Sequence, residues 1–151
     1  MIKVVQALSK EEISQLRALL SLIGWHQRQI EGQIEAIEKF LKDANCVVLF
    51  ALEKQRIIGY ISAQFYAWNN LSQIHGLVVH PDHRNKGIAT KLVKEVEAFM
   101  KGQGARGIYA DTPVDNVNGC HFYKSNDFEQ AYIMPEYYDA GQDGVTFQKF
   151  F

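Results

Sequence analysis

Residues 80–90, which read His-Pro-Asp-His-Arg-Asn-Lys-Gly-Ile-Ala-Thr, combine residue types that suit phosphate binding. They lie between an expected strand over 74–79 and the start of an expected helix. The first amides of a helix lack internal partners, and the helix dipole adds partial positive charge there. Gly87 lets a ligand approach the backbone, while Arg84 and Lys86 add full charge. The segment predicts a site for phosphate oxygens, although a plain strand-to-helix turn with two solvated basic residues fits the spacing as well.

A second polar segment follows the next expected strand, 107–112. Residues 115–128 read Asp-Asn-Val-Asn-Gly-Cys-His-Phe-Tyr-Lys-Ser-Asn-Asp-Phe. Strands joined by a helical crossover run parallel, so both segments are expected at one sheet edge, where ligands of such sheets bind. Asn116 can hydrogen-bond an amide group, and Gly119, four residues before Tyr123, leaves space on that helix face. Taken alone, Tyr123 fits a half-buried aromatic equally well.

The pattern of apolar residues predicts a single domain over 1–151 in the order β-α-α-β-β-β-α-β-α-β-β. Ser9 and Glu12 fit a helix capping box, and Gly24 fits the end of that helix. The fold class is therefore α/β (α+β): a mixed, mostly antiparallel sheet of six or seven strands, with helices on both faces and one parallel strand pair. The expected strands are 2–7, 46–52, 57–67, 74–79, 107–112, 128–133 and 145–150. The expected helices are 10–23, 87–101 and 119–125, together with a second helix that contains 30–41 and whose start the sequence leaves undefined.

Composition excludes several function classes. The chain has 151 residues, of which 47% are hydrophobic and 22% charged, and its net charge of -1 predicts no broad basic face for nucleic acid. No apolar run approaches the roughly 18 residues of a membrane span, and the N-terminal residues do not resemble a signal peptide. Cys46 and Cys120 lack metal-site spacing, and His80 and His83 fit solvated loop residues, so no metal is expected. Two reduced thiols fit a cytoplasmic protein.

Together, these segments resemble the GNAT N-acetyltransferase superfamily. Residues 84–89, together with residues 77–81 before them, resemble its acyl-CoA motif. That motif has a Gln or Arg, a Gly three positions later, and a Gly or Ala two positions after that, which are Arg84, Gly87 and Ala89 here. Residues 116–128 are similar to a second signature of that family, with Gly119 where Ala is usual and Asp127 where Gly is usual. The order of elements fits the family over nearly the whole chain, and the two motifs occur in the family's order at their expected strand ends.

The resemblance implies acetyl-CoA as co-substrate and assigns residues to it. Asn116 is expected to hold the pantetheine or acetyl region, and Tyr123 to act as general acid toward the departing thiolate. The backbone amides of the expected strand 74–79, which precedes the expected phosphate site at 84–90, should pair with the pantetheine and polarise the thioester carbonyl. The residues expected at the cofactor are Leu77, Val78 and Val79 for the pantetheine, and Arg84, Asn85, Lys86, Gly87, Ile88, Ala89 and Thr90 for the pyrophosphate.

The acceptor implied by the resemblance is an amine, which is mostly charged at neutral pH and must lose a proton before attack. Relatives often place a carboxylate near Gln73 for this step, and here none is present, so Gln73 is expected only to contact the acceptor, which Asp111 should contact as well. His75 is the candidate base and is expected on the same strand face as Gln73 and Leu77; Asp111 is another candidate. Tyr137 and Tyr138 are expected to bind a cationic acceptor, although a surface turn explains them equally well.

We therefore predict an acetyl-CoA-dependent N-acetyltransferase that works by direct attack in a ternary complex, without a metal. One alternative is a non-catalytic acyl-CoA-binding or sensing module, which keeps the phosphate loop but not the proton donor. A covalent route through Cys120 is a further alternative, although the sequence offers this thiol no evident base. A purely structural domain would bind no CoA at all. The acceptor is left open among protein N-termini, lysines, polyamines, aminoglycosides and other small amines, and a homodimer is one expected assembly.

Overall fold

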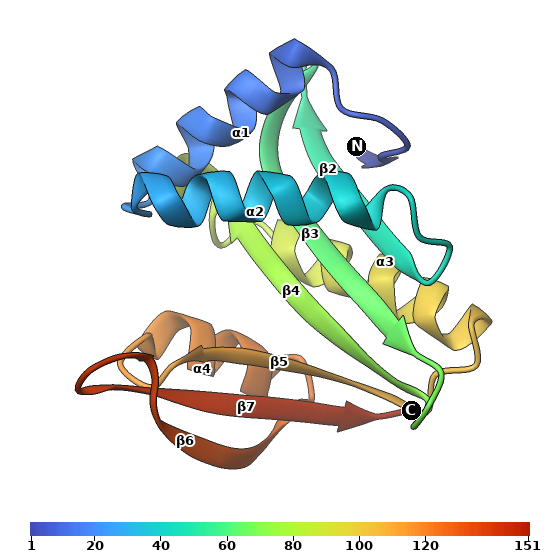
Figure 1. The fold of residues 1–151 in the computed structure, drawn as a ribbon, viewed down its shortest axis with the longest axis vertical. Helices are drawn as coiled ribbons and strands as arrows, with labels where there is room; N and C mark the ends of the chain where they lie inside the picture. The colour runs from blue at the N-terminus through green and yellow to red at the C-terminus, as the bar shows by residue number, and fades with distance from the viewer.

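A seven-stranded mixed sheet organises the chain in the order β1-β2-β3-β4-β5-β7-β6 (Figure 1). The computed structural model describes every residue, 1–151. Only β4 and β5 pair in parallel, as predicted. The elements in chain order are β1 Ile2–Val4, α1 Lys10–Leu22, α2 Gln27–Phe40, β2 Cys46–Glu53, β3 Arg56–Tyr66, β4 Leu71–Val79, a 3-10 turn Pro81–His83, α3 Ile88–Gly102, β5 Gly107–Pro113, α4 Val117–Ser125, β6 Glu129–Asp139 and β7 Gln142–Phe150.

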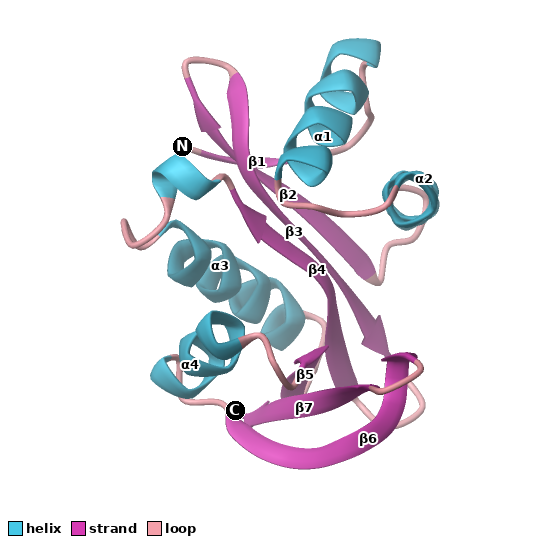
Figure 2. Ribbon diagram, turned by 90° about the vertical axis from the view of Figure 1, so that its left-hand side faces the viewer, coloured by secondary structure: helices cyan, strands magenta, loops and turns pink.

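Helices cover both faces of the sheet, and each face has its own core. In Figure 2, α1 and α2 lie on one side of the sheet and α3 and α4 on the other. The α1–α2 core is built around Leu16, Phe50 and Tyr60, which are fully buried. The α3–α4 core is built around Leu92 and Phe147, also fully buried. The observed order and the helices on both faces confirm the predicted fold class.

Local signals explain where the first two helices begin. The Ser9 hydroxyl accepts a hydrogen bond from the Glu12 amide at 3.0 Å, as the capping box predicted. The start of α2, which the sequence left undefined, lies at His26, whose amide donates to the Gln29 side chain at 3.1 Å. No helix in the structure is both long enough and apolar enough to cross a membrane.

A β-bulge interrupts β4 at His75. The pairing of β3 with β4 shifts between Ser62 and Ala63, so that Gly76 faces Ser62 and Ile74 faces Ala63, which leaves His75 without a partner. A bulge changes which face of the sheet the following side chains occupy. Ile74 accordingly packs in the α3–α4 core and Val78 in the α1–α2 core, although an even spacing would place them on the same face.

Beyond the bulge, β4 and β5 separate. Their parallel pairing runs only from the Leu71–Gly107 pair to the Ile74–Ala110 pair. Figure 1 shows the two strands spreading apart from this point, so that β5, β7 and β6 form a lower wing of the sheet. The backbone of β4 after Ile74 therefore has a partner strand on one side only.

The two ends of the sheet differ from the sequence prediction in extent. β1 ends at Val4, three residues before the predicted end. β6 continues to Asp139 rather than ending near residue 133, and all of its eleven residues are exposed. Figure 2 shows β6 bowed along the outer edge of the lower wing. A strand this exposed lacks the buried alternation by which its length could be predicted.

Candidate active site

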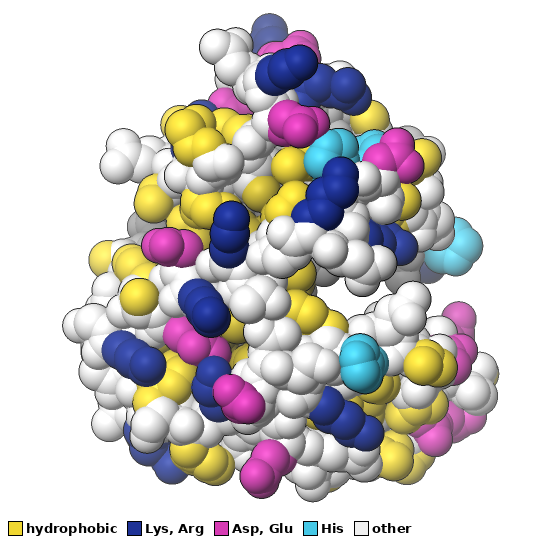
Figure 3. All heavy atoms as spheres, turned by 180° about the vertical axis from the view of Figure 1, so that it is seen from behind, with side chains coloured by type: hydrophobic (Ala, Val, Ile, Leu, Met, Phe, Trp, Pro, Cys, Tyr) yellow, Lys and Arg dark blue, Asp and Glu magenta, His cyan; other side chains and the backbone are white.

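A cleft of about 740 Å³ occupies the gap where β4 and β5 separate. The cleft is lined by Ile88 and Phe122, which pack against the α3–α4 core, and by Ile23 and Trp25, which pack against the α1–α2 core. It therefore reaches both faces of the sheet through the opening between the strands. Figure 3, a view from behind, shows the surface hollowed between the upper and lower parts of the molecule.

The turn into α3 presents a row of unused backbone donors. The amides from Asn85 to Thr90 donate to no acceptor in the protein, and Gly87, the N-cap of α3, provides no side-chain cap. Asn85 and Gly87 both have left-handed backbone conformations, with φ of 61° and 79°. Consecutive amides turned inward by such conformations form a concave site for anions. Of the residues 84–90 predicted to hold the pyrophosphate, all except Lys86 line the cleft. Phosphate binding here stays a prediction.

The free edge of β4 lies next to this turn. The His80 amide donates to the Ile58 carbonyl on β3 at 2.7 Å, and alternate residues of a strand point their amides to the same side. The Val78 amide therefore faces β3, whereas the backbone groups of Leu77 and Val79 face the cleft. Arg84 Nε donates to the Val79 carbonyl at 3.3 Å and folds the guanidinium back over the end of the strand. Of the three residues predicted to pair with a pantetheine, two thus have backbone groups that face the cleft, and the pairing itself stays a prediction.

Tyr123 is the phenol that lines the cleft. Its ring stacks on Phe147 at 5.6 Å between centroids and meets Phe128 edge-on at 5.3 Å. The residue is only 6% exposed, yet it lines the cleft, and its hydroxyl makes no hydrogen bond within the protein. Burial, and secondarily the charge of Asp111, raises the pKa of Tyr123 above its ordinary value. The phenol therefore stays protonated at neutral pH, with its proton available to a ligand.

The Asn116 side chain holds the start of α4 in place. Its Oδ1 accepts from the Gly119 amide at 3.0 Å, and its Nδ2 donates to Thr112 Oγ1 at 3.0 Å. Asn116 therefore caps α4 and ties that helix to the end of β5. The sequence interpretation gave the space at Gly119 to the contacts of Tyr123, but the Asn116 amide occupies that space. Asn116 also lines the cleft, so a role at the pantetheine stays a prediction.

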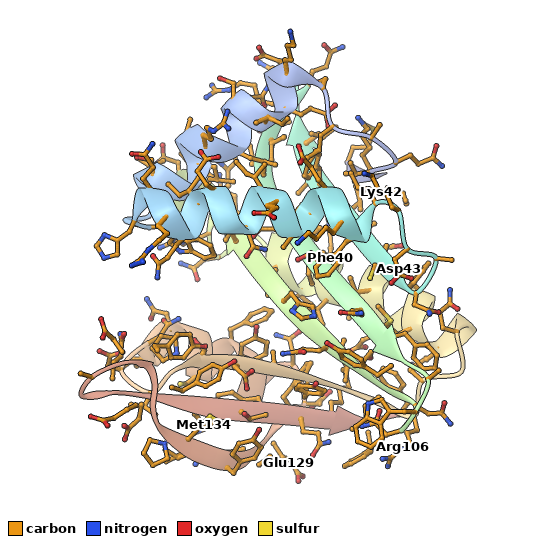
Figure 4. All side chains as sticks on the ribbon, viewed as in Figure 1. Phe40, Lys42, Asp43, Arg106, Glu129 and Met134 are labelled. Atoms are coloured by element: carbon orange, nitrogen blue, oxygen red, sulfur yellow. The ribbon has the colours of Figure 1, made fainter.

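His75 reaches the cleft from the bulge in β4. Its ring packs against Phe40 at 5.0 Å between centroids, and its Nε2 lies 3.2 Å from the Tyr66 hydroxyl. Figure 4 shows Phe40 near the end of α2, in front of the central strands. His75 shares the α1–α2 face with Gln73, as predicted, but not with Leu77, which packs toward the α3–α4 core. The prediction for Leu77 was wrong because the bulge reverses the alternation of side chains.

The acid–base properties of His75 suit a proton acceptor. Partial burial lowers the pKa of His75, and the charge of Asp111 opposes this effect. His75 keeps contact with solvent in the cleft, so burial acts on it less than it would in the core. The imidazole is therefore neutral at pH 7 and has a lone pair available. Its role as a base stays a prediction.

Asp111 is the only carboxylate that lines the cleft. It extends from β5 and accepts a hydrogen bond from the Thr146 hydroxyl on β7. Tyr137 and Tyr138 do not line the cleft. They are still 47% and 40% exposed, so only partial burial, followed by the charge of Asp111, raises the pKa of the two phenols. Both tyrosine rings pack over Gly144, where a β-carbon would meet Tyr137 Cδ1 at 2.9 Å. Asp111 thus lies in the cleft and the two tyrosines lie beside it.

Several cleft residues had no part in the sequence interpretation. Ile23 and Trp25 come from the connection between α1 and α2, and His121 comes from α4. The signal for Trp25 was an aromatic residue directly after the helix-ending Gly24. Gln73, expected at the acceptor, does not line the cleft because the hydroxyls of Tyr66 and Tyr109 bond its side-chain oxygen.

Comparison with known proteins agrees with this geometry. Residues 10–128 match the family model described as the acetyltransferase (GNAT) family. The chain is 27% identical over 114 residues to an N-alpha-acetyltransferase of Saccharolobus solfataricus, covering 68% of each protein. It is 31% identical over 94 residues to an aminoglycoside N(6')-acetyltransferase type 1 of Acinetobacter genomosp. 13, covering 57% of this chain and 64% of that protein.

The fold is shared with a solved structure of an aminoglycoside 6'-N-acetyltransferase complexed with coenzyme A. The TM-score is 0.81 at 17% identity, and the match covers 99% of this chain and 96% of the other. With the family match over residues 10–128, the fold and the cleft place the chain in the GNAT acetyltransferase family, and it is therefore an acetyltransferase.

Proposed function

We propose that this protein transfers the acetyl group of acetyl-CoA to a primary amine by direct attack in a ternary complex. The observation that carries the proposal is the row of six amides from Asn85 to Thr90 that have no acceptor in the protein. A diphosphate supplies the oxygens that such donors require. The unpaired edge of β4 continues from this turn and can bind an extended pantetheine as an added strand. The coenzyme A in the aminoglycoside acetyltransferase structure of the same fold supports this choice of ligand.

The reaction removes two protons from the acceptor nitrogen. The ammonium first gives one proton to a base, and the free amine then attacks the carbonyl carbon. The C–S bond breaks as the C–N bond becomes an amide, and the sulfur leaves with the electron pair. The second nitrogen proton is lost as the sulfur gains one, so the products are an amide and a free thiol. Tyr123 suits donation toward this sulfur, because its hydroxyl lies in the cleft without a protein partner.

His75 is proposed as the base for the first proton. It lies on the face of the sheet that Trp25 and Ile23 share, and this is the face opposite the turn into α3. The acceptor would therefore enter from the α1–α2 side, with Asp111 attracting its positive charge. His75→Ala should abolish most turnover at neutral pH, and full activity of this variant across pH 6 to 9 would refute the assignment.

An acetyl-transfer assay that measures released thiol across an amine panel tests the function. The panel should contain peptide N-termini, lysine peptides, polyamines and aminoglycosides, since the related proteins are named for α-amines and aminoglycosides. Turnover on at least one class is expected. Saturable CoA binding without turnover on any amine would instead indicate a binding module. Cys120 does not line the cleft, and its Sγ contacts the Pro113 carbonyl at 4.0 Å, which disfavours a covalent route.

We further propose that residues 1–151 act as one domain in the cytoplasm and associate as a homodimer. Both cysteines are free thiols, which fits a reducing compartment. β6 is an edge strand with exposed Tyr132, Ile133 and Met134 side chains, and such an edge can pair with another chain. A second copy of this chain is the simplest partner for it.

A further inference from the structure

Gln73 lies at the centre of a hydrogen-bonded group on the α1–α2 face. Its Oε1 accepts from the Tyr66 hydroxyl at 2.9 Å and from the Tyr109 hydroxyl at 3.2 Å. The Tyr66 oxygen also lies 3.2 Å from His75 Nε2. The three strands β3, β4 and β5 contribute one member each to the bonds at Gln73. No part of this group has a role in the reaction described above except His75.

The direction of the hydrogen bonds made by Tyr66 and Tyr109 indicates which ring nitrogen of His75 is protonated. A phenol has one proton, and the amide oxygen of Gln73 can only accept. The hydroxyls of Tyr66 and Tyr109 therefore both donate their hydrogen bonds to Gln73. Burial raises the pKa of both phenols, that of Tyr109 to about 12, so neither loses its proton near neutral pH. The Tyr66 oxygen then faces His75 Nε2 with a lone pair. A hydrogen bond between them requires the proton to be on Nε2.

We propose that Gln73 and Tyr66 are positioning residues that hold neutral His75 in its Nε2–H tautomer and make Nδ1 the basic nitrogen. This inference rests on the proposed function of His75. The contact with Phe40 and the bulge fix the direction of the ring. When Nδ1 takes a proton from the acceptor ammonium, Nε2–H keeps its bond to Tyr66. The group therefore needs no rearrangement in either protonation state.

The amide at position 73 suits this role better than a carboxylate would. A glutamate could accept the same two phenol protons, but its charge would favour the protonated imidazole. Asp111 already acts on His75 in that direction. A neutral acceptor at Gln73 orders Tyr66 without adding a second negative charge. The proposal thus accounts for a glutamine at a position where a carboxylate would otherwise be expected.

The test replaces Gln73 with methionine, which has a similar length and no strong acceptor. Tyr66 is then free to donate to Nε2, and this favours the Nδ1–H tautomer that cannot act as base. Histidine-specific ¹⁵N NMR should find the Nε2–H tautomer at His75 in the wild type and the Nδ1–H tautomer in Gln73→Met. His75→Gln identifies the resonance among the five histidines. The value of kcat/KM should fall by roughly tenfold or more, within the usual contribution of a general base.

A second substitution separates this effect from simple damage. Phenylalanine at 66 cannot donate, so the double variant Tyr66→Phe/Gln73→Met should recover activity relative to Gln73→Met alone. Gln64→Met on the neighbouring strand is the matched control, because Gln64 pairs with Gln73 across the sheet but makes no bond to the group. The control should retain the wild-type rate and tautomer.

Three results would overturn the inference: an Nδ1–H tautomer in the wild type, wild-type kinetics in Gln73→Met, or no recovery in the double variant. Failure of the proposed function would look different. The wild type would then lack acetyl transfer while its NMR spectrum still showed the Nε2–H tautomer.

Discussion

Asn116 and Gly119 fit together so closely that a β-carbon at position 119 would meet Asn116 Nδ2 at 2.5 Å. The contact exists because Asn116 Oδ1 accepts from the Gly119 amide and caps α4. The same helix presents Tyr123 to the cleft. The glycine therefore supports the position of the proposed acid through the helix cap.

Gly119→Ala should displace the Asn116 amide and weaken the cap. The expected cost is about 1 kcal/mol of unfolding free energy, the usual contribution of such a cap. Urea denaturation measures it. Gly102→Ala is the control, because a β-carbon at Gly102, the last residue of α3, meets nothing within 4 Å. An equal loss in both variants would show that the cap contact is not the cause.

Tyr123→Phe should lower kcat without weakening the binding of CoA. The hydroxyl has no protein partner, so its removal leaves no unsatisfied group and should not destabilise the fold. Loss of a proton donor costs roughly a hundredfold or more in rate when the donor acts fully. Since a phenol is a weak donor toward a thiolate, we expect the low end of that range. Steady-state kinetics and calorimetric CoA titration separate the two effects, and unchanged kcat would remove Tyr123 from the mechanism.

The dependence of kcat on pH should follow His75. Because burial lowers the pKa of His75, the base is available at neutral pH, and kcat should fall as the pH drops through this lowered value. Asp111 raises the pKa of His75, so in Asp111→Asn the fall in kcat on the acidic side, the acidic limb of the pH profile, should move to lower pH. Asp115→Asn, outside the cleft lining, should leave the limb in place. A shift of the limb to higher pH in Asp111→Asn would contradict the assignment.

The lowered pKa of His75 also makes the stability of the fold depend on pH. A histidine with a lowered pKa in the folded state favours folding above its unfolded pKa, and this contribution is lost as the pH falls through the folded value. His75→Gln should therefore lose less stability than the wild type between pH 7 and 5. Denaturant midpoints at the two pH values provide the measurement.

If β6 mediates a homodimer, a charge on its exposed face should separate the subunits. Met134→Glu places a carboxylate among exposed apolar side chains, so this variant should sediment as a monomer while the wild type sediments at twice the chain mass. Val4→Glu makes the same change on β1, at the other edge of the sheet. That control should remain dimeric, and a monomeric wild type would exclude the dimer.

Sequence patterns predicted the element order because both helical and strand periodicities are strong in this chain. The Ser9 cap, the free amides at the turn into α3 and the parallel pair of β4 with β5 all depend on neighbouring residues or on general handedness rules. Such features can be derived without tertiary contacts. The family motifs then located the cleft at the correct edge of the sheet.

The bulge at His75 was missed because the strand was assumed to alternate regularly. Gly76 was the available signal, since a glycine inside a strand often marks a bulge. In the structure, a β-carbon at Gly76 would meet the Tyr60 hydroxyl at 2.5 Å. The group formed by Tyr66, Gln73 and Tyr109 could not be predicted either, because it joins three strands whose register depends on that bulge.

The account depends most on the free amides at the turn into α3, and coenzyme A titration of two glycine variants tests them directly. Gly87 and Gly104 both have left-handed conformations, with φ of 79° and 94°, so alanine strains both backbones alike. Gly87→Ala adds a methyl group where the diphosphate must approach, whereas Gly104 lies outside the cleft lining. We predict that Gly87→Ala weakens CoA binding at least tenfold and that Gly104→Ala binds like the wild type. Equal affinity in the two variants, with no change in the amide resonances of residues 85–90 on adding CoA, would contradict the account.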